Sequence, residues 1–158
     1  MLRSGFVLFH IVAALAALPT CASSSARLEQ APEPGRSLVF LRLACRTSGV
    51  VFFESPRPLH GRLRIPCAKQ PGVLRTLQVR PTLYELQLTL DGERFTRIWT
   101  ANLFDGGTQP GGIRYWGDIT VDNGESVRIA HDPDTIREFR ARARMDAGTP
   151  IPFAVSKE

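Results

Sequence analysis

Apolar and polar residues alternate with a period of two in one short stretch after another between Ser37 and His131. In the clearest stretch, Thr82–Leu90, every second residue from Tyr84 onward is large and apolar. Because successive side chains of a strand point to opposite faces, this pattern predicts strands with one buried face. Turn-forming Gly, Pro, Asn and Asp residues separate the stretches, which is typical of an antiparallel all-β domain.

The alternation and the turn signals predict about seven to eight strands. The link 46–48 is short enough for a hairpin, and Asp91-Gly92 is a strong hairpin signal. Gly117 lies within a strand pattern and indicates a bulge, in a stretch that places Tyr115 on one face with Val121. The expected strands are Ser37–Cys45, Gly49–Glu54, Arg62–Cys67, Val73–Arg80, Thr82–Leu90, Arg94–Phe104, Ile113–Val121 and Ser126–His131.

The period changes after the last of these stretches. Asp132 followed by Pro133 is typical of a helix start, and Gly148 is expected to end the helix. A narrow apolar stripe that includes Phe139 favours packing on the sheet. The arginines on the remaining faces leave open a helix that lies on a membrane or a partner. The predicted fold is mainly β, an antiparallel β-sandwich with one C-terminal helix.

Residues 1–20 have the features of a signal peptide. Arg3 precedes the apolar run Phe6–Leu18, which is too short for a stop-transfer helix. The run ends in Leu18-Pro19-Thr20-Cys21, which resembles a bacterial lipobox. The resemblance implies cleavage before Cys21, acylation of that residue and, because Ala22 is not aspartate, an outer-membrane location facing the periplasm. Ordinary cleavage after Ala22 or Ala26 would instead give a soluble secreted protein.

Composition bounds the remainder of the chain. Its 158 residues suit one domain, which we place at 37–158 behind a Ser- and Pro-rich tether at 21–36. Lys+Arg of 20 against Asp+Glu of 15 gives a net charge of +5, nearly all of it from arginine. The arginines are scattered along the chain, which argues against a nucleic-acid partner. We expect the membrane, through the lipid on Cys21, and a second envelope protein as partners.

The three cysteines fit an oxidising compartment. If Cys21 is acylated, Cys45 and Cys67 remain, and each ends the apolar face of its own predicted strand. Both sulfurs should therefore point into the core, which favours a disulfide, with two separate buried thiols as the alternative. The chain has no Cys-x-x-Cys or His-x-x-x-His spacing, so no metal site is predicted.

Two further segments, together with Cys21, resemble a loose class of small bacterial envelope lipoproteins with a β-sandwich domain. Residues 81–86 (PTLYEL) are similar to its strand entry, and residues 113–119 (IRYWGDI) to its Tyr-x-Gly-Asp-Ile strand. The resemblance spans about Ser37 to Arg144. It implies the fold and no activity.

We therefore expect an accessory or structural binding role without catalysis and without a cofactor. The alternative is a soluble secreted or periplasmic domain for carbohydrate or peptide, with Trp99, Tyr115 and Trp116 as its stacking surface. Catalysis would need converging ionisable groups, for which Glu54, His60 and Asp118 are the candidates. No motif in the sequence gives these three a nucleophile or an orienting partner.

Overall fold

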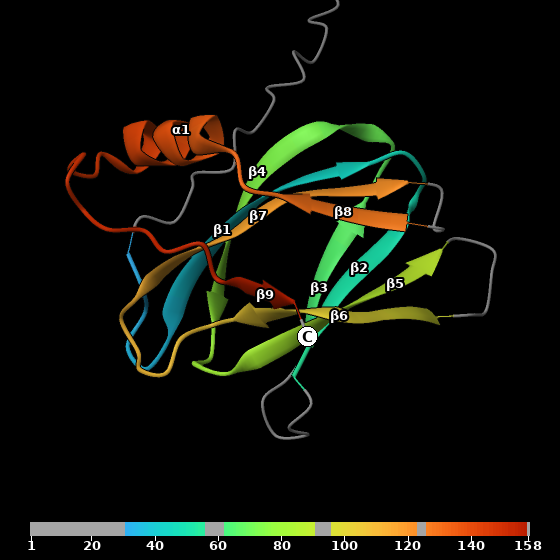
Figure 1. Ribbon diagram of the computed structural model, residues 1–158, viewed down its shortest axis with the longest axis horizontal. Helices are drawn as coiled ribbons and strands as arrows, with labels where there is room; N and C mark the ends of the chain where they lie inside the picture. Colours follow the sequence, from blue (N-terminus) through green and yellow to red (C-terminus); the bar gives the residue numbers. More distant parts are fainter. Residues whose placement is uncertain (1–30, 56–61, 91–95, 123–125, 158) are drawn as a thin grey trace, which may run out of the picture.

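The computed structural model describes residues 31–55, 62–90, 96–122 and 126–157, apart from the side chains of residues 70, 88–90, 96–102 and 157 (Figure 1). The predicted signal peptide, Cys21 and most of the tether lie outside this range. The first eight strands overlap the predicted ranges, and β9 is additional. The elements are β1 (Ser37–Cys45), β2 (Gly49–Glu54), β3 (Arg62–Cys67), β4 (Gln70–Val79), β5 (Leu83–Leu90), β6 (Thr96–Asp105), β7 (Ile113–Asp122), β8 (Ser126–Ala130), α1 (Pro133–Ala143) and β9 (Val155–Lys157).

The strands form two sheets that pack as a β-sandwich, which confirms the predicted fold class. Sheet A has the order β4-β1-β7-β8, and sheet B has the order β3-β2-β5-β6-β9. The β5–β6 and β7–β8 pairs are antiparallel as expected, whereas β1 and β7 pair in parallel. The predicted hairpin between β1 and β2 is wrong. These strands belong to different sheets, so residues 46–48 carry the chain from one layer to the other.

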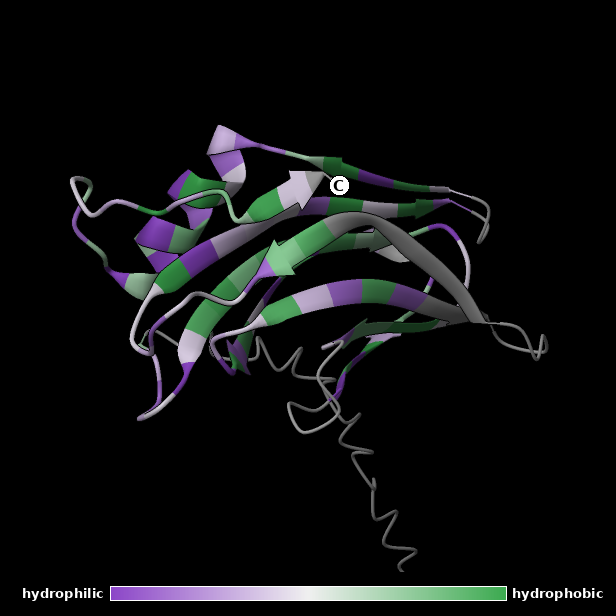
Figure 2. Ribbon diagram, turned by 60° about the horizontal axis from the view of Figure 1, so that its bottom comes forward, coloured by the Kyte–Doolittle hydropathy of each residue, from purple (hydrophilic) through white to green (hydrophobic). Residues whose placement is uncertain are grey.

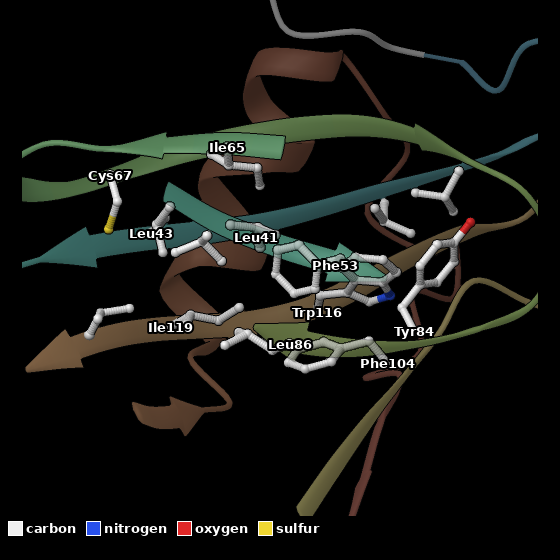
Figure 3. Close-up of a cluster of buried hydrophobic side chains, with 14 of the residues drawn as sticks. Leu41, Leu43, Phe53, Ile65, Cys67, Tyr84, Leu86, Phe104, Trp116 and Ile119 are labelled. Atoms are coloured by element: carbon white, nitrogen blue, oxygen red, sulfur yellow. The ribbon is translucent and has the colours of Figure 1, made fainter. Parts of the chain in front are cut away.

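One apolar core fills the space between the two sheets. Hydrophobic and hydrophilic residues alternate along the strands (Figure 2), and the inward residues of both sheets meet there. Trp116 lies among Phe53, Tyr84 and Phe104, with ring centroids 4.9, 5.4 and 5.4 Å away (Figure 3). Tilted aromatic contacts at these separations add to the stabilisation that comes from burying the rings.

Cys45 and Cys67 meet across this core. Cys45 ends β1 in sheet A and Cys67 ends β3 in sheet B, and their Cα atoms lie 5.8 Å apart in a disulfide. This arrangement confirms the predicted pairing. Both residues are buried, at 3% and 2% exposure. In the chain-entropy model a cross-link that closes a loop of this length stabilises the fold by about 3 kcal/mol.

Helix α1 forms a third layer on the outer face of sheet A. It begins as predicted, because the Asp132 side chain accepts from the Asp134 backbone N–H and Pro133 occupies the first turn. Phe139 is fully buried and stacks on Phe40 of β1 at 3.9 Å. This packing confirms that the apolar stripe faces the sheet. The predicted end at Gly148 is wrong, since the helix ends at Ala143 with Arg144 in the left-handed conformation.

A bulge at Gly117 divides β7 into two halves, and the alternation of inward and outward side chains shifts between them. Phe40 of β1 pairs with Tyr115, but the next paired residue, Arg42, lies opposite Asp118. Gly117 supplies the left-handed φ of 92° that the bulge requires. The predicted bulge is present, but Tyr115 does not share a face with Val121 as expected. Tyr115 faces α1, while Val121 lies in the core between the sheets.

The segment before β9 joins the two sheets at one corner. Tyr115 of β7 exchanges backbone hydrogen bonds with it, donating to Pro152 at 3.0 Å and accepting from Ala154 at 2.9 Å. The Ala154 carbonyl in turn accepts from Asp105 of β6 at 2.9 Å. Residues 152–154 therefore connect β7 of sheet A with β6 of sheet B.

Candidate interaction surface

A polar network lies between α1 and the outer face of sheet A. The Nε of Arg42 donates to Thr135 Oγ1 at 3.0 Å, and its Nη2 pairs with Glu138 Oε2 at 2.5 Å. Thr135 Oγ1 in turn donates to Asp118 Oδ2 at 3.0 Å. These groups come from β1, β7 and α1, so the interlayer network (Arg42, Tyr115, Asp118, Thr135 and Glu138) ties the helix to two strands at once.

Tyr115 adds a second buried hydroxyl to this network, beside that of Thr135. Its Oη donates to Asp118 Oδ1 at 2.5 Å and accepts from the Asp132 backbone N–H at 3.3 Å. Burial raises the pKa of the Tyr115 phenol well above its usual range, and the hydrogen bond to Asp118 raises that pKa further. The phenol therefore keeps its proton at neutral pH and acts as a donor to Asp118.

The polar groups of the interlayer network bond to one another. Both oxygens of Asp118 already accept hydrogen bonds, from Tyr115 and from Thr135. Each oxygen accepts one of these bonds, which orients the carboxylate of Asp118 toward Tyr115 and Thr135 beneath α1. The network is therefore suited to fastening α1 onto sheet A.

Two of the three ionisable residues considered for catalysis, Glu54 and Asp118, do not converge. Glu54 lies on β2 of sheet B and pairs with Arg62 at 3.9 Å, whereas Asp118 lies beneath α1 on the outer face of sheet A. The two carboxylates are on opposite sides of the sandwich, so the possible pair of Glu54 and Asp118 is contradicted. His60, the third candidate, lies outside the described residues.

The predicted stacking surface is wrong for two of its three residues. Tyr115 and Trp116 are both fully buried, Tyr115 under α1 and Trp116 between the sheets. Trp116 Nε1 donates to the Asp105 carbonyl at 3.1 Å, so its polar end is also satisfied inside. The side chain of Trp99 is outside the described part. Tyr115 and Trp116 point to opposite faces of β7. Both are buried because α1 covers one face and sheet B covers the other.

Sheet B, in contrast, has no helix over its outer face in the described part of the chain (Figure 1). The residues that point outward alternate with core residues such as Val51, Phe53 and Leu86. We call this surface the bare face. Its described side chains include Val50, Phe52, Glu54, Arg62, Arg64, Leu83, Glu85, Gln87 and Leu103.

Phe52 points outward on the bare face, between Arg64 of β3 and Gln87 of β5. The guanidinium carbon of Arg62 lies 3.6 Å from the centroid of the Phe52 ring. Arg62 Nη2 also donates to Gln87 Oε1 at 3.3 Å, which holds the guanidinium over the ring. A cation on an aromatic face at an exposed site stabilises the pair by about 0.5–1 kcal/mol. Sequence reasoning missed this pair, although the outward alternation of Arg62 and Arg64 in β3 marks β2 residues opposite them as outward too.

Two carboxylates lie directly opposite each other next to this pair. Glu54 of β2 is in register with Glu85 of β5, and Arg62 of β3 is in register with Glu54 on its other side. Like charges at directly opposite positions destabilise a sheet. Among the described residues, Arg62 alone forms an ion pair with either carboxylate, with Glu54 at 3.9 Å. The bare face therefore carries excess negative charge at one point.

Several other functions find no support in the described residues. They contain no group of three or more His, Cys, Asp or Glu side chains placed to hold a metal ion. Across the same residues, no helix has the length and apolar character needed to cross a bilayer. No protein-family model matches the chain, and a search of curated proteins finds no match either.

Proposed function

We propose that the protein is an exported cell-envelope lipoprotein whose non-catalytic β-sandwich binds another envelope component through the bare face. In this proposal the leader 1–20 is removed, Cys21 is acylated, and residues 22–36 link the lipid to the domain. The lipobox-like ending Leu18 to Cys21 supports the acylation. Ala22 after the cysteine supports an outer-membrane location facing the periplasm.

The observation that carries the proposal is the pairing of Cys45 with Cys67 between the two sheets. A buried disulfide between layers suits a chain that folds in an oxidising compartment. Reducing it would remove a link between β1 and β3, which belong to different sheets. Export and the disulfide therefore support each other, and Cys21 is left as the third cysteine, outside the domain.

The make-up of the bare face supports binding. Aromatic residues and arginine contribute most of the affinity in many protein interfaces, and Phe52 and Arg62 lie together on this surface. A basic group from a partner would relieve the repulsion between the neighbouring carboxylates of Glu54 and Glu85. We therefore expect a protein partner with a lysine or arginine at its centre of contact.

Fractionation of cells that make the wild-type chain or Cys21→Ser tests the proposal, with intact-mass measurement of each mature product. The wild type should stay with membranes and start at a Cys21 that carries a diacylglyceryl thioether and an acylated amine. Cys21→Ser should lose the lipid mass and the membrane association. An unmodified wild-type chain that starts at Ser23 or Arg27 would contradict the lipoprotein assignment and favour the soluble secreted domain.

A further inference from the structure

The point at which the chain enters the domain is fixed by Gln78 of β4. The Gln78 side-chain amide donates to the Ala31 carbonyl at 2.9 Å, and its Oε1 accepts from the Glu33 backbone N–H at 3.0 Å. Arg36 holds the same segment, since it pairs with Glu33 at 3.3 Å and donates to the Gln78 carbonyl at 3.3 Å. These bonds therefore hold residues 31–36 against β4. We call this contact the clasp.

This clasp lies on the same side of the sandwich as α1. Gln78 is in register with Leu38 of β1, and Leu38 belongs to the apolar cluster that packs beneath Phe139 of the helix. Residues directly opposite each other in a sheet share a face. The tether therefore enters on the outer face of sheet A, and the bare face lies on the other side of both sheets.

The reach of the tether is short compared with the domain. Ten peptide links separate Cys21 from Ala31. They span at most about 35 Å when fully extended, and about 17 Å on average as a flexible coil. A domain of this size has a radius of gyration of about 14 Å. Turning the bare face to the bilayer would therefore require a nearly straight tether, at a cost in chain entropy.

From this geometry, and resting on the proposed anchoring at Cys21, we infer that the outer face of sheet A, with α1, lies against the bilayer surface. The bare face then points away from the membrane, toward the periplasm. The exposed surface of α1 suits contact with lipid headgroups without insertion, because Arg137 and Arg142 are 70% and 55% exposed. The acidic and basic residues of 132–146 balance, with four of each, so the tether and not net charge sets the orientation.

A synthetic anchor tests the orientation without relying on acylation in the cell. With Cys45 and Cys67 bridged, Cys21 is the only free thiol of the mature chain, so it can be coupled to a maleimide phospholipid in nanodiscs. Paramagnetic headgroup lipids in the same discs then broaden the NMR signals of amides close to the bilayer. The amides of Ala141 and Gln78 should lose several-fold more intensity than those of Phe52 and Arg64. Equal or reversed losses would overturn the inference.

A matched variant separates the entry point from general adsorption to lipid. It carries Cys21→Ser and one added cysteine after Glu158, so that the same phospholipid attaches behind β9, on an edge of sheet B. The preference for α1 should then disappear. If α1 remains the broadened element in this variant, a surface property and not the tether sets the orientation, and the inference fails. Failure of acylation in cells would leave both nanodisc results unchanged and would count against the proposed function alone.

Discussion

The two outer faces of the sandwich are both built from strands with alternating residues, but α1 covers the face of sheet A and no described helix covers the face of sheet B. Beneath α1, the polar groups of Arg42, Asp118 and Thr135 bond to one another, and Phe40 stacks on Phe139. On the bare face, the guanidinium of Arg62 lies over the ring of Phe52, and two glutamates face each other. A strand's outward residues thus become core or surface according to which later element covers them.

The largest effect is expected from a change that closes the space at the bulge. In Gly117→Ala, the new Cβ would lie 2.9 Å from Ile129 Cγ2 and 3.0 Å from the Ala130 carbonyl, at a φ of 92°. We expect a loss of about 3–5 kcal/mol in unfolding free energy, from backbone strain and overpacking together. Gly35→Ala is the matched control, because φ is also positive there but no atom lies within 4 Å of the Cβ. Equal urea midpoints for the two variants would contradict this account of the bulge.

Matched carboxylate-to-amide changes compare the two faces directly. Asp118→Asn weakens the acceptor for Tyr115 and Thr135 and removes the negative charge near Arg42, at 3.6 Å. We expect it to lower the unfolding free energy by about 1–3 kcal/mol. Glu85→Gln relieves the repulsion from Glu54 and should change stability by no more than about 0.5 kcal/mol, in the stabilising direction. Urea unfolding at neutral pH measures both, and a larger loss in Glu85→Gln would reverse the proposed contrast.

A smaller effect should appear in alkaline solution. The pKa of Tyr115 is raised in the fold, so the folded state retains the phenol proton where the unfolded chain has lost it. Its contribution is fully present below pH about 10 and is lost above it, by at most about 1.4 kcal/mol per pH unit. The pKa of Tyr84 is raised by burial as well and adds to the same decline. Tyr115→Phe should flatten the fall in unfolding free energy above pH about 10 relative to the wild type, and an unchanged slope would contradict the assignment.

The smallest effect on stability is expected at Arg62 on the bare face. Arg62→Ala removes the cation from Phe52 and the hydrogen bond to Gln87, and should cost less than about 1 kcal/mol. The same variant should nevertheless weaken retention of the partner on the bare face. Arg137→Ala on α1 is the control, since Arg137 is 70% exposed and, among the described residues, pairs only with Asp134. Thermal unfolding and co-purification measure the two effects separately.

Local patterns in the sequence predicted the strands and the helix start well, but they did not predict which elements lie next to each other. The inward faces of β1 and β3, the cysteine pair and the Asp132 cap follow from spacing alone. The pairing of β1 with β7 does not, because a period of two says which face is buried and not which strand lies beside it. The helix ends at Ala143 and not at Gly148, with Arg144 as its left-handed cap, and Met145 beyond it packs against the cluster beneath α1.

The candidate surface was harder to predict for the same reason. Tyr115 and Trp116 have the composition of a stacking surface, but α1 and sheet B cover them from two sides. Phe52 belongs to an apolar run that is typical of a buried strand, and yet it faces outward on the bare face. Exposure depends on the packing of distant elements, and the pattern within one strand does not contain that information.

Site-specific photo-crosslinking in cells tests the difference between the two faces most directly. A photoreactive residue replaces Arg64 on the bare face in one variant and Arg137 on α1 in another, with the leader and Cys21 intact. The account predicts a discrete protein adduct from position 64 and adducts with lipid alone from position 137. A protein adduct from position 137 with none from position 64 would contradict it.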